Sequence, residues 1–325
     1  MNQLELLQQH SVIVADTGEL ELIKTHQPQD ATTNPSLILK VADLPEYQGL
    51  ISDALEFARS QSASQGLNAS DAVRCAAERL TVLIGCEISR VIPGLVSTEI
   101  DARLSFDTQA MVTKAEQFIE WYDSLGVSSD RVLIKIAATW EGIQAARVLE
   151  SNGIRCNLTL LFALPQAQAC ADAGVYLISP FVGRITDWHT AQGKTFDAHN
   201  DPGVLSVKQI FSYYKTHGVS TVVMAASFRN TGQIMALSGC DRLTISPALL
   251  SELARLDGLN DQHDAQLSAE LSAELNAELN AEPLNEADFR WAMNDSVMAA
   301  EKLADGIRKF AADAEALEAL LSARL

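Results

Sequence analysis

Eight short apolar segments, each ending in polar residues, recur along the chain and constrain its fold more than any other feature. One of them contains the run Val-Leu-Ile-Lys-Ile-Ala, which is apolar almost throughout. Such a run is typical of a parallel strand that is covered on both faces. The eight segments lie at residues 12–16, 30–36, 96–101, 131–137, 156–161, 175–180, 221–229 and 243–247.

The stretches between these segments carry helical patterns. Within residues 107–125, apolar side chains recur close to every 3.6 positions, which favours an amphipathic helix. Further helices are predicted at residues 46–60, 70–91, 140–150 and 164–173. The extra segment 185–202, after the sixth strand, is interpreted as a long loop at the carboxyl ends of the strands. A glycine, which suits a left-handed helix end, precedes five of the strands: Gly126, Gly153, Gly174, Gly218 and Gly239.

Eight strands alternating with helices predict an α/β fold, the (β/α)8 barrel, with additional N- and C-terminal helices. A Rossmann sheet is disfavoured because the chain contains no GxGxxG motif. We expect residues 1–325 to form one barrel domain, with residues 286–325 as a C-terminal helical extension lying across it. Residues 266–283 repeat Ser/Asn-Ala-Glu-Leu, which we interpret as a surface insert rather than a partner-binding helix.

Charge and composition exclude several classes of protein. The formal net charge of −18 argues against a general nucleic-acid binder, which needs a cationic face. The longest uncharged stretch, residues 156–171, is too short and too polar to span a membrane. The N-terminus has no signal-peptide pattern, and the five cysteines form no CxxC motif, so we expect reduced core thiols in a cytoplasmic protein.

Lys135 is the sharpest candidate for chemistry, because it is the only lysine within an apolar strand segment. Burial disfavours a charged ammonium, and a neutral amine attacks carbonyls to form a Schiff base. The alternative is an ion-paired lysine near a strand end. Other polar residues at the predicted strand ends, where barrel enzymes keep their catalytic groups, are Asp16, Thr32, Asn34, Glu99, Asp101, Asn157, Thr159, Ser179, Arg184, Ser227, Arg229 and Ser246.

Two carboxylates and two guanidinium groups among these residues have chemistry of their own. Glu99 and Asp16 are candidates for proton transfer, unless they pair with Arg103 or other bases at the barrel mouth. Arg184 and Arg229 are candidates for binding a phosphate, unless they are ordinary surface arginines. The six histidines form neither HxH at a strand end nor HExxH, so no metal site is expected.

Seven motifs, in the same order over nearly the whole chain, resemble those of the transaldolase family. They are Val14-Ala-Asp16-Thr-Gly, Asp30-Ala-Thr-Thr-Asn34-Pro-Ser, Val96-Ser-Thr-Glu99-Ile-Asp-Ala-Arg103-Leu, Ile134-Lys135-Ile-Ala, Cys156-Asn157-Leu-Thr159-Leu, Ile178-Ser179-Pro-Phe181-Val-Gly-Arg184 and Ser227-Phe-Arg229-Asn. The resemblance implies transfer of a dihydroxyacetone unit from sedoheptulose 7-phosphate to glyceraldehyde 3-phosphate. It implies sugar-phosphate substrates, no cofactor, no metal, a cytoplasmic location and a homodimer.

The same resemblance implies a role for each matching residue. Lys135 would form the Schiff base, and Glu99 and Asp16 would be the acid/base pair, with Glu99 acting through a water held by Thr159. The remaining positions would bind substrate. Asn34, Asn157 and Ser179, with Thr32 beside them, would hold hydroxyl groups; Arg184, Ser227 and Arg229 would bind phosphate; and Phe181 would shield the intermediate.

Two departures from the family pattern and two alternatives stand beside this reading. Strand seven reads Met224-Ala225-Ala226-Ser227 where the family usually has glycine at the second position, and the repeat at 266–283 has no counterpart in the family. A free aldolase, such as fructose 6-phosphate aldolase, is disfavoured because those relatives have Gln and Tyr in place of Glu99 and Phe181. A catalytically silent sugar-phosphate binder would not need Lys135, Glu99 and Asp16 together.

Overall fold

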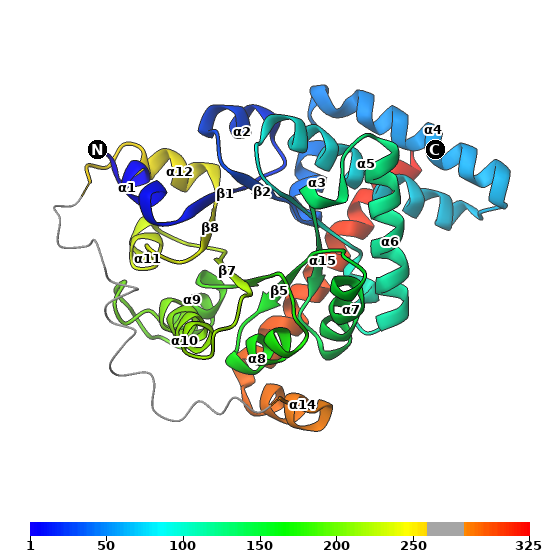
Figure 1. Cartoon of the computed structure of the whole chain (residues 1–325). Helices are drawn as coiled ribbons and strands as arrows, with labels where there is room; N and C mark the ends of the chain where they lie inside the picture. The colour runs from blue at the N-terminus through cyan, green and yellow to red at the C-terminus, as the bar shows by residue number, and fades with distance from the viewer. Residues whose placement is uncertain (259–282) are drawn as a thin grey trace.

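The computed structural model describes residues 1–258 and 283–325, and its centre is a closed barrel of eight parallel strands. Each strand pairs with the next one along the chain, and β8 closes the barrel against β1 (Figure 1). The predicted (β/α)8 barrel is therefore confirmed. The strands are β1 Val12–Asp16, β2 Asp30–Thr32, β3 Val96–Glu99, β4 Val132–Ala137, β5 Cys156–Leu161, β6 Leu177–Pro180, β7 Val222–Ala225 and β8 Arg242–Ile245.

The register of the central strands brings polar residues to one level of the barrel. Glu99 of β3 lies opposite Lys135 of β4, and Lys135 lies opposite Asn157 of β5. Every residue of these three strands is buried, because helices cover the outside and side chains fill the inside. Since side chains alternate along a strand, residues opposite one another in register point to the same side.

Helices connect the strands and surround the barrel (Figure 1). The helices predicted at residues 46–60 and 70–91 are confirmed as α4 and α5, which pack against each other between β2 and β3. The helices that precede β6 are α1 Gln3–His10, α2 Leu20–His26, α3 Pro35–Ala42, α4 Gln48–Gln65, α5 Ala69–Val91, α6 Thr108–Ser124, α7 Trp140–Ser151 and α8 Leu164–Asp172. Those that follow β6 are α9 Gly183–Thr190, α10 Pro202–Thr216, α11 Thr231–Met235, α12 Pro247–Leu253, α14 Glu286–Asp295 and α15 Val297–Ser322. Short 3-10 helices are η1 Pro45–Tyr47, η2 Ala102–Leu104 and η3 Ser129–Arg131.

The structure corrects three boundaries that the sequence predicts. The second strand ends at Thr32, before the predicted 30–36 segment does, because Pro35 begins α3 and Asn34 caps that helix through the backbone N–H of Leu37. The seventh strand is likewise shorter than residues 221–229. The predicted loop 185–202 is half wrong, since α9 occupies its beginning. Only Ile185 and Gly183 of α9 are buried, so its sequence shows no helical apolar period.

Two helices, α14 and α15, follow the barrel at the C-terminal end of the chain, and α1 precedes it. Helix α15 begins at the Ser296 cap and contacts α3, α5, β5 and α9, so it lies across one end of the barrel (Figure 1). These elements confirm the expected additional N- and C-terminal helices. The predicted repeat at 266–283 falls, except for its last residue, outside the described residues.

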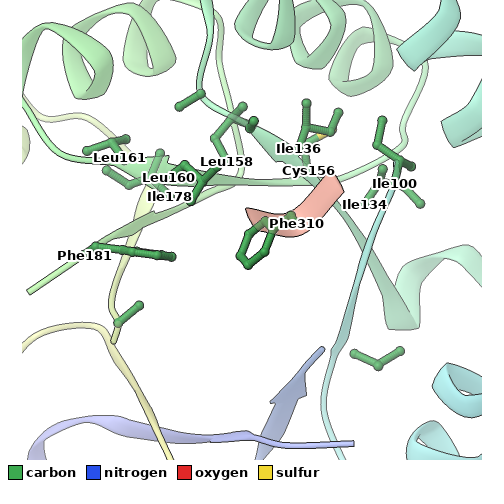
Figure 2. Close-up of a cluster of buried hydrophobic side chains, with 14 of the residues drawn as sticks. Ile100, Ile134, Ile136, Cys156, Leu158, Leu160, Leu161, Ile178, Phe181 and Phe310 are labelled. Carbon is green, nitrogen blue, oxygen red and sulfur yellow. The ribbon is translucent and has the colours of Figure 1, made fainter. Parts of the chain in front are cut away.

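Local features of the chain agree with the sequence patterns. The five glycines predicted to end helices all have positive φ, between 63° and 94°. All five cysteines are buried and free, as expected for core thiols. No helix in the described part of the chain is long and apolar enough to cross a membrane. Most of the buried apolar side chains form one large cluster, part of which Figure 2 shows, and a second, smaller cluster consists of Val14, Leu133, Leu177 and Met224.

Candidate active site

Lys135 and Glu99 form a buried ion pair at the centre of the barrel mouth. The side chains are 6% and 3% exposed, and Nζ of Lys135 lies 3.1 Å from Oε2 of Glu99. The same Nζ donates to the carbonyl oxygen of Thr33 at 3.2 Å. Burial raises the pKa of Glu99, while the charge of Lys135 lowers it and the charge of Asp16 raises it. The amine therefore sits in a desolvated pocket with a proton acceptor in direct contact.

Asp16 supplies a second carboxylate beside the lysine. It is the last residue of β1, and burial raises its pKa, with the charges of Lys135 and Arg184 acting in the opposite direction. Two carboxyl groups whose pKa values are both raised, next to one amine, are candidates for accepting and returning protons during a reaction. Within the described residues neither Asp16 nor Glu99 pairs with Arg103, although Glu99 does pair with another base at the barrel mouth, Lys135.

Arg103 instead binds Asp101, one of the predicted strand-end residues. The two side chains form an ion pair at 2.6 Å, and Arg103 also pairs with Glu318 of α15. Arg103 therefore joins η2 to the C-terminal helix, and Asp101 is a structural partner of that arginine. Ser246 lies at the start of α12 and makes no side-chain cap to it.

Polar side chains from β3, β5 and β6 make a hydrogen-bonded row next to the lysine. Asn157 donates from Nδ2 to Oγ of Ser97 at 3.1 Å, and its Oδ1 accepts from Oγ of Ser179 at 2.6 Å. Sequence reasoning missed Ser97. The available signal was its position two residues before Glu99, which places both side chains on the same face of β3. The row orients Asn157 and Ser179 within the barrel.

Two threonines and one asparagine complete this side of the site. The Oγ1 atom of Thr159 is buried and has no hydrogen-bond partner among the described residues, so it can bind a ligand or a water. Thr32 is buried at the end of β2, and the one hydrogen bond that its Oγ1 makes within the described residues is to the carbonyl of Thr33, at 3.4 Å. The Oδ1 atom of Asn34 caps α3 by accepting a hydrogen bond from the backbone N–H of Leu37.

Arginines gather at the opposite side of the mouth, after β6 and β7. Nη1 of Arg184 is buried without a hydrogen-bond partner in the described part of the chain. Burial lowers the pKa of Arg184, and the neighbouring charge of Arg229 lowers it further. Arg229 is exposed, pairs with Asp187 at 2.7 Å, and places Nη1 3.3 Å from Oγ of Ser227. Two guanidinium groups and a hydroxyl thus lie near one another, and such a set of donors suits an anion.

Backbone geometry aims these groups. Ser227 has φ of +63°, a left-handed conformation that is uncommon for residues other than glycine. A side chain at Gly183 would lie 2.4 Å from the carbonyl oxygen of Ser227 and 2.7 Å from Cγ of Arg229. The start of α9 therefore packs directly against the turn after β7. Ala225, which departs from the family's usual glycine, is fully buried at the end of β7.

Aromatic rings enclose the mouth. Phe181 is buried, packs edge-on against Phe162 at 5.5 Å, and lies 5.0 Å from the guanidinium carbon of Arg184. The ring of Phe310, from α15, lies on the same side of the barrel strands as Phe181 (Figure 2). Its centroid is 6.0 Å from Nζ of Lys135. Sequence reasoning missed Phe310 because α15 lies outside the β/α repeat.

Most of the predicted strand-end residues lie around Lys135 at the carboxyl ends of the strands, whereas Asp101 is tied to Arg103 and Ser246 begins α12. The described residues contain no group of three or more His, Cys, Asp and Glu side chains that could hold a metal ion. A (β/α)8 barrel with one buried lysine between carboxylates at its strand ends is the arrangement of enzymes that process carbonyl substrates through an imine.

Comparisons with known proteins identify the family. The family model for transaldolase/fructose-6-phosphate aldolase matches residues 13–321. The transaldolase of Alteromonas mediterranea is 56% identical, over all of this chain and 99% of its own length. The transaldolases of Shewanella baltica and Haemophilus influenzae are each 54% identical over at least 99% of both chains. The chain belongs to the transaldolase/fructose-6-phosphate aldolase family and is a transferase of the transaldolase type.

Proposed function

We propose that the protein transfers a dihydroxyacetone unit from sedoheptulose 7-phosphate to glyceraldehyde 3-phosphate, giving erythrose 4-phosphate and fructose 6-phosphate. The observation that carries this proposal is the Lys135 amine, buried in the barrel mouth 3.1 Å from Glu99. The full-length similarity to transaldolases supports the same reaction.

The reaction begins when Lys135 gives a proton to Glu99, its ion-pair partner, and the resulting neutral amine attacks C2 of the ketose. The carbinolamine loses its hydroxyl group as water and becomes an imine. A carboxylate then takes the proton of the C4 hydroxyl, the C3–C4 bond breaks, and its electron pair moves into the protonated imine. Erythrose 4-phosphate leaves, the remaining enamine attacks the aldehyde carbon of the acceptor, and the carboxyl group returns its proton to the new hydroxyl oxygen. Water finally hydrolyses the new imine and frees the lysine.

The carboxylates and Thr159 move the protons. We assign to Asp16 the acceptance of the C4 proton, because burial raises its pKa and makes it a stronger base than an exposed aspartate. Glu99 exchanges protons through a water held by Thr159, a role supported by the buried, unpartnered Oγ1 of that threonine. The iminium itself draws in the electrons, so the scheme requires neither a metal nor another cofactor.

The remaining residues bind the two ends of the sugar phosphate. Asn157 and Ser179, oriented by the contact with Ser97, hold hydroxyl groups of the dihydroxyacetone unit. Asn34 and Thr32 border the same side. At the other end, the phosphate contacts Arg184, Ser227 and Arg229, and Phe181 keeps water away from the enamine.

The cellular setting is also part of the proposal. We place the enzyme in the cytoplasm, in the pentose phosphate pathway, as a homodimer of single-domain protomers that contact neither nucleic acid nor a membrane. The resemblance to the family and the charge of −18 support this setting. Light scattering at several concentrations would measure the mass of the assembly, and a mass of one chain throughout would contradict the dimer.

Borohydride trapping tests the function directly. The protein is incubated with fructose 6-phosphate and borohydride, and peptides are examined by mass spectrometry. A reduced dihydroxyacetone adduct on Lys135 is expected, and its absence would support a silent binder instead. Adding erythrose 4-phosphate should give sedoheptulose 7-phosphate. Fast release of free dihydroxyacetone without an acceptor would favour a free aldolase.

A further inference from the structure

The C-terminal helix α15 contributes a ring to the phosphate side of the barrel mouth. The guanidinium carbon of Arg184 lies 5.0 Å from the ring centroid of Phe181 and 5.4 Å from that of Phe310. Both distances are within the range of cation–π attraction. Phe310 is 2% exposed, so its ring is in a fixed, dry environment. Arg184 is therefore held by one ring from the strand end and one from a helix more than 120 residues later.

Ring contacts leave the donors of a guanidinium unoccupied, whereas a carboxylate contact consumes them. The N–H groups of arginine lie in the plane of the guanidinium, and a ring attracts that group without accepting its in-plane hydrogen bonds. Nη1 of Arg184 is indeed buried without a partner among the described residues. Arg229 is held by a carboxylate contact instead, since its guanidinium group pairs with Asp187 at 2.7 Å.

The position of Phe310 is set by specific contacts of α15 near Arg184. Gly306 lies one turn before Phe310, and a side chain there would come within 2.6 Å of Leu160 Cδ2 and 3.3 Å of Arg184 Nη1. Glu301 accepts a hydrogen bond of 2.6 Å from the indole of Trp188, which belongs to the same helix as Arg184. Helices α9 and α15 are therefore joined next to the two rings.

We propose that Phe310 is a positioning residue for phosphate recognition, which holds the Arg184 guanidinium with its donors free to bind the phosphate of the substrate. The proposal deepens the proposed function and rests on it for the identity of the substrate. It assigns to α15 a part in substrate recognition that does not come from the strand-end motifs. The donor and the acceptor substrate both carry a phosphate group, so both half-reactions depend on the contact between Phe310 and Arg184.

The experiment compares Phe310→Leu, which removes the ring but keeps an apolar side chain, with Phe310→Tyr, which keeps the ring. Phe289→Leu is the matched control, since Phe289 is equally buried in the C-terminal helices but packs against Trp140. The dissociation constant of inorganic phosphate is measured by calorimetry, together with KM and kcat for fructose 6-phosphate and for unphosphorylated dihydroxyacetone. Phe310→Met replaces the leucine variant if that variant does not fold.

Loss of one cation–π contact predicts that Phe310→Leu weakens phosphate binding roughly 2- to 30-fold. KM for fructose 6-phosphate should rise by a similar factor, with little change in kcat or in KM for dihydroxyacetone. Phe310→Tyr and Phe289→Leu should bind phosphate as the wild type does. In an Arg184→Ala background, Phe310→Leu should add no further loss, because the ring acts through the arginine.

Two results would overturn the proposal: unchanged phosphate affinity in Phe310→Leu, or an equal loss with and without Arg184. A failure of the proposed function is recognised separately. Absence of a borohydride adduct in the wild type refutes the transaldolase chemistry, whereas the binding of inorganic phosphate tests the role of Phe310 without any turnover.

Discussion

Replacing Arg184 by methionine should weaken phosphate binding without destabilising the fold. In the unliganded protein Nη1 of Arg184 is a buried donor without a partner, and such a donor costs about 1–3 kcal/mol. The change also removes cation–π attraction of about 0.5–2 kcal/mol. Contacts of the methionine sulfur with the same rings restore about 0.3–1.5 kcal/mol. The free energy of unfolding is therefore expected to rise by about 1 kcal/mol.

The same substitution removes charge-assisted hydrogen bonds to the phosphate. Each is worth about 1.5–3 kcal/mol, or about 10- to 150-fold in affinity. Arg229→Met is the comparison, because Arg229 is exposed and already paired with Asp187, and it should cost less affinity. Urea unfolding gives the stability, and KM for fructose 6-phosphate against dihydroxyacetone gives the phosphate contribution. A loss of more than 1 kcal/mol of stability, or equal effects on both substrates, would refute the reasoning.

Three further substitutions test the chemistry of the site. Lys135→Arg should abolish transfer while circular dichroism stays unchanged, because arginine keeps the charge next to Glu99 but forms no imine; activity within about tenfold of the wild type would contradict this. Asp16→Asn should lower kcat and raise stability at pH 7. The folded-state pKa of Asp16 is raised, so ionising this carboxyl group destabilises the wild type as the pH rises through that pKa. At about pH 3 Asp16 is protonated in both the folded and the unfolded state, and the stability advantage of Asp16→Asn in thermal melts should vanish there. Thr159→Val should reduce kcat with stability kept within about 1 kcal/mol, since its buried hydroxyl has no described partner to lose, and an unchanged kcat would exclude the water-holding role.

The sequence predicts the barrel well because its signal is repeated eight times. Each strand is a short apolar run, and five of the strands are preceded by a glycine with positive φ, as at Gly126 and Gly153. Boundaries were less predictable where a proline or a polar helix followed a strand directly. Pro35 starts α3 within a segment that reads as strand, and α9 has too few buried residues to show an apolar period.

Individual site residues were predictable where a charged side chain stands within an apolar strand segment, which is otherwise expected to be buried. Lys135 is conspicuous because an ammonium within an apolar strand is costly, and Glu99 lies opposite it in register. Ser97 was not predictable in the same way, since a serine in a strand is ordinary. Its importance appears only when the register places it on the inner face, within 3.1 Å of Asn157.

The element that shields the site from solvent, α15, was the least predictable part of the site. Strand ends of a barrel open toward solvent, yet Lys135 is only 5% exposed. Part of that protection comes from α15, which lies over the mouth and brings Phe310 to within 6.0 Å of the lysine nitrogen. The apolar period of α15 predicts that one face is buried, but it does not say against which element. Gly306 identifies the contact only once Leu160 and Arg184 are seen beside it. The chemistry of the site is therefore encoded in strand motifs, whereas its dryness depends on a helix that follows the barrel, and substitutions on that helix should alter catalysis without touching any motif.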